Sequence, residues 1–430
     1  MTADRPLRTA EVIAVGSELL GSTRLDTNSL YLSEKLAALG IELRAKAVVG
    51  DSRDDLAKIF RQALDRVDVV VLTGGLGPTD DDVTRDVVGS VLNLPFTEDA
   101  SIVEWIEQRF SRRGMHMPEV NRRQAMVPRG AIVLDNPNGT APGLFIEHEG
   151  QVVVLLPGPP RELQPMFERL VAGPLGSRSG SERIYRTVLL TTGRGESHIE
   201  EAIQPIYSTW REETPPIETT ILATPGQIEV HLSLRSDDPV KAKARLTSAR
   251  EALVAALGEA VFSLDGRPME QILGELLRDR GLTISAAESC TGGLFLSRLT
   301  DVPGSSAYVL SGVVAYSNRA KTDFLGVSPD LIAAHGAVSE PVAVAMADGI
   351  RSKTGASFGI GITGIAGPDG GTPEKPVGTV AIAVVGPEGA AKVRTLLLAG
   401  SRSMIKFWAT QAAMDVVRKM IVRDEAVRRH

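Results

Sequence analysis

Hydrophobic and polar positions follow one another in a way that predicts repeated units of a buried strand, a polar loop and a helix. Mainly apolar runs, which are typical of buried strands, occur at 10–15, 67–72, 152–156 and 282–286. Each run leads into a stretch with turn-forming or polar residues, followed by a helical pattern. The chain is therefore predicted to be a multidomain α/β protein with ligand loops at its strand ends.

The middle of the chain has a different pattern. Strands are predicted near 185–190, 217–223 and 228–234, with one helix after Ser197 and another at 239–257. A small-residue linker at 172–180 and the turn at 264–268 bound this small α+β module. We therefore expect three domains, at 1–172, 181–262 and 266–425.

Composition narrows the classes of function. The 430 residues include 47 basic and 53 acidic side chains, so the formal charge of −6 gives no bulk attraction for phosphate. Aromatic residues make up 4%, too few for a base-stacking surface, and nucleic acid is disfavoured as a partner. One cysteine excludes an internal disulfide, and no Cys/His spacing indicates zinc. The polar residues 1–8 and the lack of an apolar run of about 18 residues predict a cytoplasmic protein without a membrane partner. A homodimer is expected only because symmetric dimers are common.

A candidate nucleophile lies in Ala287-Glu288-Ser289-Cys290-Thr291-Gly292-Gly293, between a predicted strand and a predicted helix. Free N–H groups at a helix N-terminus can stabilise an oxyanion, and glycines let a substrate approach the backbone. Ser289 can instead be no more than the helix cap. Cys290 is an alternative nucleophile, or a small buried filler.

A candidate base lies in a second cluster, 314–321, where another strand ends and a helix begins. Lys321 can accept the serine proton if its pKa is lowered, and the Tyr316 hydroxyl can relay it. The alternative for Lys321 is a solvated surface lysine. No surrounding motif marks any of the histidines as a partner: His116, His148, His198, His231, His335 and His430.

The glycine-rich stretch 359–371 is predicted to be a ligand loop that follows another apolar strand. Its N–H groups can hold a phosphate, and Thr363 can add a hydroxyl donor. A long flexible connection is the alternative. Lys375 and Arg402 are nearby cations, and Arg402, at the start of the last helix, is the better candidate for a phosphate clamp.

These three clusters, in this order, resemble the C-terminal domain of the CinA (competence/damage-inducible) family, the nicotinamide mononucleotide amidohydrolases. The resemblance implies hydrolysis of the carboxamide to nicotinate mononucleotide and ammonia, without a cofactor. It implies Ser289 as nucleophile, Lys321 as base and Tyr316 as a further catalytic group. The implied substrate-binding residues are Thr291, Gly292, Gly293, Asn318, Thr363, Gly364 and Arg402.

The first 172 residues contain a second set of ligand loops. Gly16 and Glu18 follow the first strand, and the loop 73–84 contains three consecutive aspartates, Asp80 to Asp82. An aspartate here can cap the next helix, but a divalent cation would relieve the repulsion between neighbouring carboxylates. Asp81 and Asp82 are therefore the candidate metal ligands, with Glu18 as a further carboxylate.

Two more loops, 136–143 and 156–162, also follow predicted strands, although each alone fits ordinary turn chemistry. Together the loops resemble the molybdopterin-binding fold of MoaB and MogA in its CinA version, a three-layer α/β domain. This resemblance implies a pyrophosphatase that acts on ADP-ribose with a divalent metal (Mg, Mn or Co) and a monovalent cation. The implied ligand residues are Gly16, Glu18, Thr73, Gly74, Gly75, Gly77, Pro78, Thr79, Asn138, Gly139, Thr140, Pro157, Gly158 and Pro159.

The family places a KH-like domain in the central segment, yet no Gly-x-x-Gly loop with basic flanks is found there. A spacer or an oligomer contact is the favoured role. For the whole chain, two classes of function remain: an enzyme of pyridine-nucleotide recycling, and a non-enzymatic molybdopterin-type binder or competence/DNA-damage factor. The pairing of Ser289 with Lys321 favours the enzyme.

Overall fold

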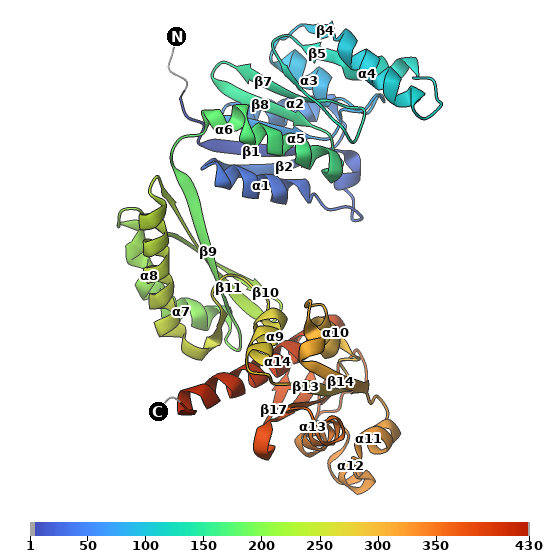
Figure 1. Ribbon diagram of the computed structural model, residues 1–430, viewed down its shortest axis with the longest axis vertical. Coiled ribbons are helices and arrows are strands. Elements are labelled where there is room, and N and C mark those ends of the chain that lie inside the picture. The colour runs from blue at the N-terminus through green and yellow to red at the C-terminus, as the bar shows by residue number, and fades with distance from the viewer. Residues whose placement is uncertain (1–4, 429–430) are drawn as a thin grey trace. The chain divides into compact units, whose positions relative to one another are not determined.

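The computed structural model describes residues 5–428 (Figure 1). The chain divides into two compact units. The first runs to Tyr185 and includes Arg235–Ala242, and the second comprises Arg186–Leu234 and the chain from Lys243 onward. In the described part of the chain, no helix combines the length and the apolar character needed to cross a membrane.

The first unit is built on a sheet with the strand order β2-β1-β3-β8-β7-β6. The apolar runs of the sequence become its central strands, which are buried on both faces. Strands β2, β1, β3 and β8 are parallel, and β7 and β6 run antiparallel at one edge. The strand bounds are β1 Thr9–Val15, β2 Glu42–Val49, β3 Val69–Thr73, β6 Ile132–Leu134, β7 Gly143–His148 and β8 Gln151–Leu156.

Helices cover both faces of this sheet, which confirms the predicted three-layer α/β domain (Figure 1). Leucines of α1, α5 and α6 pack on one face, and apolar residues of α2 and α3 pack on the other. A two-stranded antiparallel sheet of β4 and β5, with α4 between them in the chain, lies to one side (Figure 1). The bounds are α1 Asn28–Ala38, α2 Arg53–Leu64, α3 Thr84–Val91, α4 Ala100–Ser111, α5 Pro160–Ala172, α6 Pro174–Arg178, β4 Phe96–Glu98 and β5 Met126–Pro128.

The prediction that residues 172–180 form a linker is wrong, because most of this segment is helical. Helix α5 runs to Ala172, and the short helix α6 begins directly after Gly173. Pro174 at the first position of α6 has the backbone φ that a helix start needs. Leu175 is completely buried in the core of the first unit. Burial of this side chain makes the segment part of the domain.

The central module has a sheet with the order β10-β11-β9-β12, and helices α7 and α8 accompany it (Figure 1). Every second residue of β11, from Ile228 to Leu234, is buried, which confirms the alternation that predicted this strand. The predicted helix at 239–257 matches α8. The bounds are β9 Arg183–Thr191, α7 Glu196–Tyr207, β10 Glu218–Thr224, β11 Gln227–Ser236, α8 Pro239–Leu257 and β12 Val261–Ser263.

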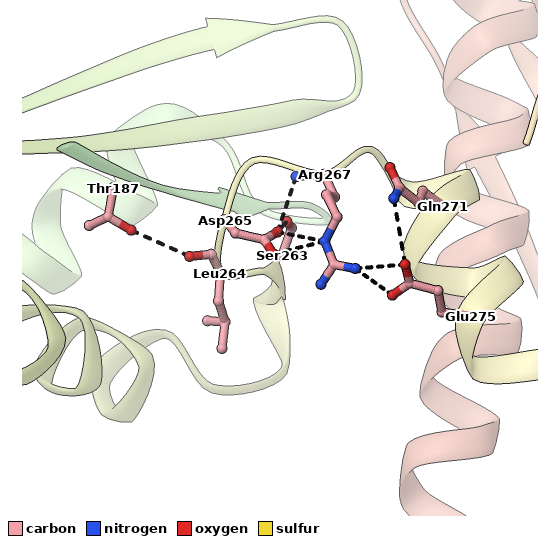
Figure 2. Close-up of polar contacts among 7 residues, drawn as sticks. All are labelled: Thr187, Ser263, Leu264, Asp265, Arg267, Gln271 and Glu275. Atoms are coloured by element: carbon pink, nitrogen blue, oxygen red, sulfur yellow. Dashed lines mark hydrogen bonds and ion pairs between the residues drawn. The ribbon is translucent and has the colours of Figure 1, made fainter. Parts of the chain in front are cut away.

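The turn after β12 is held by one arginine (Figure 2). Arg267 donates to both carboxylate oxygens of Asp265 and, through Nη1, to both oxygens of Glu275 on the next helix, α9 (Met269–Asp279). The Asp265 carboxylate also accepts the Arg267 N–H and the Ser263 hydroxyl. The predicted boundary at 264–268 is thus a turn whose entry into α9 is fixed by charge pairs.

The C-terminal part has a sheet with the order β14-β13-β15-β16-β17, in which β14, β13 and β15 are parallel. Helices α9, α10 and α14 contribute to the core on one face, and α11, α12 and α13 to that on the other. The bounds are β13 Ile284–Glu288, α10 Leu294–Thr300, β14 Val309–Val314, α11 Asn318–Leu325, α12 Pro329–His335, α13 Glu340–Thr354, β15 Phe358–Gly364, β16 Thr379–Val385, β17 Ala391–Leu397 and α14 Arg402–Arg428.

The prediction of a loop over 359–371 is wrong in its first half, because residues 358–364 form the central strand β15. A Cβ at Gly359 or Gly361 would lie 2.1 Å from a backbone carbonyl oxygen of α13. These glycines therefore allow α13 to pack closely on the sheet. The irregular segment begins only after Gly364.

Candidate active sites

The nucleophile loop begins at the carboxyl end of β13, between its parallel neighbours β14 and β15. Ser289 follows this strand directly, and its N–H donates to the carbonyl of Ile362 on β15 (2.9 Å). Its side chain is buried, with an exposed fraction of 7%. The sheet thus fixes the backbone of the candidate nucleophile at the edge where parallel strands present their ligands.

Lys321 lies beside this serine. Its Nζ is 3.1 Å from Ser289 Oγ and donates to the backbone carbonyls of Ala315 (2.9 Å) and Tyr316 (3.3 Å). The side chain is 1% exposed, which excludes the alternative of a solvated surface lysine. Burial lowers the pKa of Lys321 below its usual 10.5, because desolvation penalises the ammonium form. The geometry and the pKa shift both suit a proton acceptor for Ser289.

Glu288, rather than Ser289, caps helix α10. Its fully buried carboxylate accepts the N–H groups of Gly293 (2.9 Å), Phe295 (3.2 Å) and Leu296 (3.0 Å). The alternative in which Ser289 is only a helix cap is therefore wrong. The expectation that free N–H groups of this helix form the oxyanion site is also wrong for these three groups, because each already has an acceptor.

The turn between Ser289 and the helix retains other donors. The N–H groups of Cys290 and Thr291 donate to no carbonyl of the described residues. The Thr291 hydroxyl is buried and has no hydrogen-bond partner in the part of the chain that the structure describes. Gly292 and Gly293 adopt positive φ angles of 62° and 92°, which glycine alone adopts without strain. These glycines bend the chain so that the turn stays next to the nucleophile.

Cys290 is a packed core residue. It is 5% exposed and belongs to the apolar cluster between the sheet and α14. Burial raises the pKa of its thiol to about 11. A thiol that stays protonated in this way is a poor nucleophile at neutral pH, which favours Ser289.

Tyr316 does not relay a proton to Lys321. It offers Lys321 only its backbone carbonyl, and its side chain is 62% exposed. Its hydroxyl accepts instead from Arg402 Nη2 (3.1 Å), while Arg402 Nη1 donates to the Gly367 carbonyl (2.7 Å). Arg402 therefore ties the strand-end cluster to the glycine-rich loop. Asn318 is exposed on the first turn of α11.

Thr363 is not available as a hydroxyl donor to a ligand. Its hydroxyl is buried and donates to the Ala337 carbonyl (2.8 Å). Gly364 ends β15, and Lys375 donates to the carbonyls of His335 and Val338 (2.9 and 2.8 Å). Thr363 therefore connects the segment around residues 335–339 to the sheet, and Lys375 connects it to the loop between β15 and β16. Their residue types did not indicate this role.

The first unit contains a cavity of about 760 Å³ at the carboxyl ends of its parallel strands. Position 74 accepts only glycine, since a Cβ there would lie 2.2 Å from the Val15 carbonyl oxygen. Thr79 does not line the cavity, and its hydroxyl donates to Asp82 (2.6 Å). The other predicted residues do line it: Gly16, Glu18, Thr73, Gly74, Gly75, Gly77, Pro78, Asp81, Asp82, Asn138, Gly139, Thr140, Pro157, Gly158 and Pro159.

The two candidate metal ligands differ in their surroundings. Asp82 Oδ1 accepts the Gly77 N–H (2.7 Å), and Oδ2 accepts the N–H and the hydroxyl of Thr79 (2.9 and 2.6 Å). Asp82 therefore caps the loop itself, and its role as a metal ligand stays a prediction. Asp81 is exposed, and the Thr79 hydroxyl lowers the pKa of its carboxyl. Among residues 5–428, no three His, Cys, Asp or Glu side chains form a group that could hold a metal ion.

Sequence reasoning missed several residues of the cavity wall. Asn28 at the start of α1 donates to the Gly158 carbonyl (2.7 Å), and Asp26 precedes it. Arg109 in the last turn of α4 and Arg113 just after this helix also line the cavity. The polar run 26–28 ahead of a helix and the basic pair were the available signals. Neither signal indicated which strand ends would lie beside these residues in the folded protein.

Comparison with known proteins assigns a class to each part. Residues 11–176 match the model of a "Probable molybdopterin binding domain", residues 186–263 that of the "Damage-inducible protein CinA KH domain", and residues 266–421 that of the "CinA C-terminal domain". These matches define a protein with a MoaB/MogA-type domain, a KH-type domain and a CinA C-terminal domain.

Full-length relatives identify the family. A CinA-like protein of Koribacter versatilis is 45% identical over 417 residues, which cover 96% of this chain and 100% of that protein. A CinA-like protein of Solibacter usitatus is 43% identical over 413 residues, with coverage of 96% and 98%. The chain belongs to the CinA family. Among solved structures, a competence/damage inducible protein from Agrobacterium tumefaciens is 37% identical and covers 36% of this chain and 96% of its own, with a TM-score of 0.35.

Proposed function

We propose that the C-terminal domain is an amidohydrolase that converts nicotinamide mononucleotide to nicotinate mononucleotide and ammonia. The observation that carries this proposal is the buried contact of 3.1 Å between Lys321 Nζ and Ser289 Oγ. A hydroxyl beside a lysine whose pKa is lowered is the arrangement of Ser-Lys acyl-transfer enzymes. The substrate follows from the family resemblance, and the side-chain chemistry is consistent with an amide.

The pair supports a two-step reaction. Neutral Lys321 accepts the proton of Ser289 Oγ as that oxygen attacks the carboxamide carbon. Collapse of the tetrahedral intermediate breaks the C–N bond, and Lys321 returns the proton so that ammonia leaves. A water then attacks the acyl ester and its proton passes to Lys321. The bond from the acyl carbon to Ser289 Oγ breaks, Lys321 gives the proton to this oxygen, and nicotinate mononucleotide leaves.

The oxyanion of this intermediate needs donors beside Ser289. The N–H groups of Cys290 and Thr291 lie in the turn directly after the nucleophile and donate to no backbone carbonyl in the described part of the chain. The unpartnered Thr291 hydroxyl lies in the same turn. We assign the oxyanion site to these donors, in place of Thr363 and the α10 N–H groups.

Ammonia release from nicotinamide mononucleotide tests the proposal directly. The native protein in metal-free buffer is compared with Ser289→Ala and Lys321→Ala, and Lys392→Ala serves as a matched control because this lysine is exposed on β17. We expect release by the native protein and the control, and none by the two variants. If the folded native protein releases no ammonia, the proposed amidase is wrong.

For the N-terminal domain we propose a metal-dependent pyrophosphatase that acts on ADP-ribose. A cavity of about 760 Å³ is of the size that nucleotide-sized ligands occupy. Its glycines allow phosphates to approach the backbone, and Arg109 and Arg113 add positive charge. Nicotinamide mononucleotide and ADP-ribose both arise from breakdown of NAD, so the two activities fit one recycling enzyme.

The residues present fit a cation that arrives with the substrate. Mg²⁺ is commonly held by one or two carboxylates together with substrate phosphates, so a complete protein cage is not required. Asp81 is the exposed carboxylate that can ligate it, whereas both oxygens of Asp82 bind the loop. The bound cation would neutralise charge on the pyrophosphate. Asp82 keeps the loop shaped for this contact.

A binding protein without catalytic activity is the second candidate for this domain, because the same fold also serves simple ligand binding. The engagement of Asp82 with its own loop favours it. Incubation with ADP-ribose and Mg²⁺, Mn²⁺ or Co²⁺ separates the two. Formation of AMP and ribose 5-phosphate supports the pyrophosphatase, and saturable binding of intact ADP-ribose supports the binder.

A further inference from the structure

A second cation, which the sequence did not indicate, lies beside the nucleophile loop. Lys406 is on α14, and a Cβ at Gly292 would lie 3.6 Å from its Nζ. Gly292 belongs to the turn of Ser289, since its N–H donates to the Ser289 carbonyl (3.1 Å). The ammonium group of Lys406 is therefore next to the turn that carries the candidate nucleophile and oxyanion donors.

In the part of the chain that the structure describes, no protein group binds the Lys406 ammonium group at its position beside the Gly292 turn. The residue is half-buried, and its Nζ forms no ion pair or hydrogen bond with the side chains and backbone that the structure describes. The nearby carboxylate in the turn, Glu288, is already held by three N–H groups of α10. An ammonium group that has no protein partner among residues 5–428 beside this turn is available to bind an anion.

The surrounding charges support an anion site. Arg402 lies one helical turn before Lys406, on the same side of α14, and the first turn of this helix contains no acidic residue. Cations near a helix N-terminus oppose the helix dipole, so two of them in the first turns are unfavourable unless a ligand is present. Arg402 is partly engaged by Gly367 and Tyr316, whereas Lys406 is open.

We propose that Lys406 binds the phosphate of the substrate and so determines specificity for a phosphorylated nucleotide over its nucleoside. This assignment rests on the proposed amidase function. Arg402 holds the glycine-rich loop and the Tyr316 side chain against the site, and Lys406 supplies the free charge. The substrate class is a nicotinamide ribonucleotide with a terminal phosphate monoester.

Kinetics with two substrates test this role. Lys406→Met keeps most of the side-chain stem and removes the charge, Lys406→Arg keeps the charge, and Lys392→Met is the matched control. With nicotinamide mononucleotide, we expect Lys406→Met to raise KM about 10-fold or more with little change in kcat, as for loss of a charged hydrogen bond. Lys406→Arg should restore KM to within about threefold.

Nicotinamide riboside, which lacks the phosphate, is the decisive comparison. Its kcat/KM should be the same, within about twofold, for the native protein and Lys406→Met, because the missing group is the one that Lys406 binds. An equal loss for both substrates, or an unchanged KM for the mononucleotide, would overturn the proposal.

A calorimetric titration with nicotinate mononucleotide, which carries the phosphate but no carboxamide, separates this proposal from the amidase. It is done with the native protein and Lys406→Met and does not depend on turnover. Binding to the native protein that is weakened about 10-fold or lost in Lys406→Met supports the phosphate site even if no ammonia is released. Equal binding by the two proteins, or none by the native protein, overturns it. Circular dichroism of Lys406→Met checks that the variant is folded.

Discussion

The C-terminal and N-terminal candidate sites differ in how their own side chains are engaged. In the C-terminal site, Ser289 and Lys321 are buried and lie 3.1 Å apart, so the reactive groups already contact each other. In the N-terminal cavity, Asp82 is bound to its own loop and Asp81 faces solvent. The first arrangement is prepared for chemistry by the protein alone, and the second provides a shaped binding surface.

This difference teaches how to weigh a candidate residue. Burial of Lys321 lowers its pKa and so favours the neutral amine, the form that can accept a proton, since a charged amine is unfavourable away from water. Asp82 has the residue type of a metal ligand but makes the hydrogen bonds of a loop cap. Residue type alone would rank both equally, and their contacts separate them.

The largest expected effect is loss of the Ser-Lys pair. Ser289→Ala and Lys321→Met should each lower kcat for ammonia release by about 10³-fold or more, because each removes a group that takes part in bond making. ADP-ribose hydrolysis, measured on the same preparations, should be unchanged. If ammonia release and ADP-ribose hydrolysis are both lost, the two sites are not independent, which would contradict the distinction drawn between them.

Removal of divalent metal should act on the N-terminal site only. EDTA is expected to abolish ADP-ribose hydrolysis and to leave ammonia release unchanged, because the Ser-Lys reaction needs no metal. Asp81→Asn should weaken metal binding, so the metal concentration that gives the half-maximal rate should rise about 10-fold to 100-fold. Ammonia release that is lost with EDTA would contradict the assignment of the C-terminal mechanism.

Glu288 should matter for stability as well as rate. Glu288→Gln removes the charge and one of the two acceptor oxygens that bind the N–H groups of Gly293, Phe295 and Leu296. The buried donor left without an acceptor should lower the free energy of unfolding by about 2 kcal/mol. Chemical denaturation measures this loss. An unchanged stability would mean that the cap does not hold the nucleophile turn.

The pH profile should report the pKa of Lys321. Because burial lowers this pKa, kcat/KM should rise with pH and level off below the usual lysine value of 10.5. Stability should also rise with pH between the lowered pKa and 10.5, since the unfolded chain binds the extra proton there. Lys321→Arg should lose the rising limb, because arginine stays charged.

The smallest effect is expected for Cys290. Burial raises the pKa of its thiol to about 11, which makes it a poor nucleophile at neutral pH, so Cys290→Ala should keep kcat to within about threefold. Alkylation by iodoacetamide at neutral pH should be slow in the native protein. A loss comparable to that of Ser289→Ala would reverse the choice of nucleophile.

Much of the fold followed from pattern. The buried strands at 10–15 and 152–156 and helix α8 were predicted because apolar runs and helical periodicity are local signals. The prediction failed at 172–180 and at 359–364. In both segments small residues suggested a loop, but Leu175 is needed in the core and the glycines of β15 contact a helix. Such demands come from distant parts of the chain.

The sequence by itself determined the α/β class, the family, the candidate nucleophile Ser289 and the candidate base Lys321, because these depend on residue types at fixed spacings. Only the tertiary structure decided that Glu288 caps α10, that Asp82 binds its own loop and that Lys406 lies beside Gly292. Hydrogen bonds and desolvation depend on which segments meet in space. In the case of Lys406, the partner segment is more than a hundred residues away along the chain.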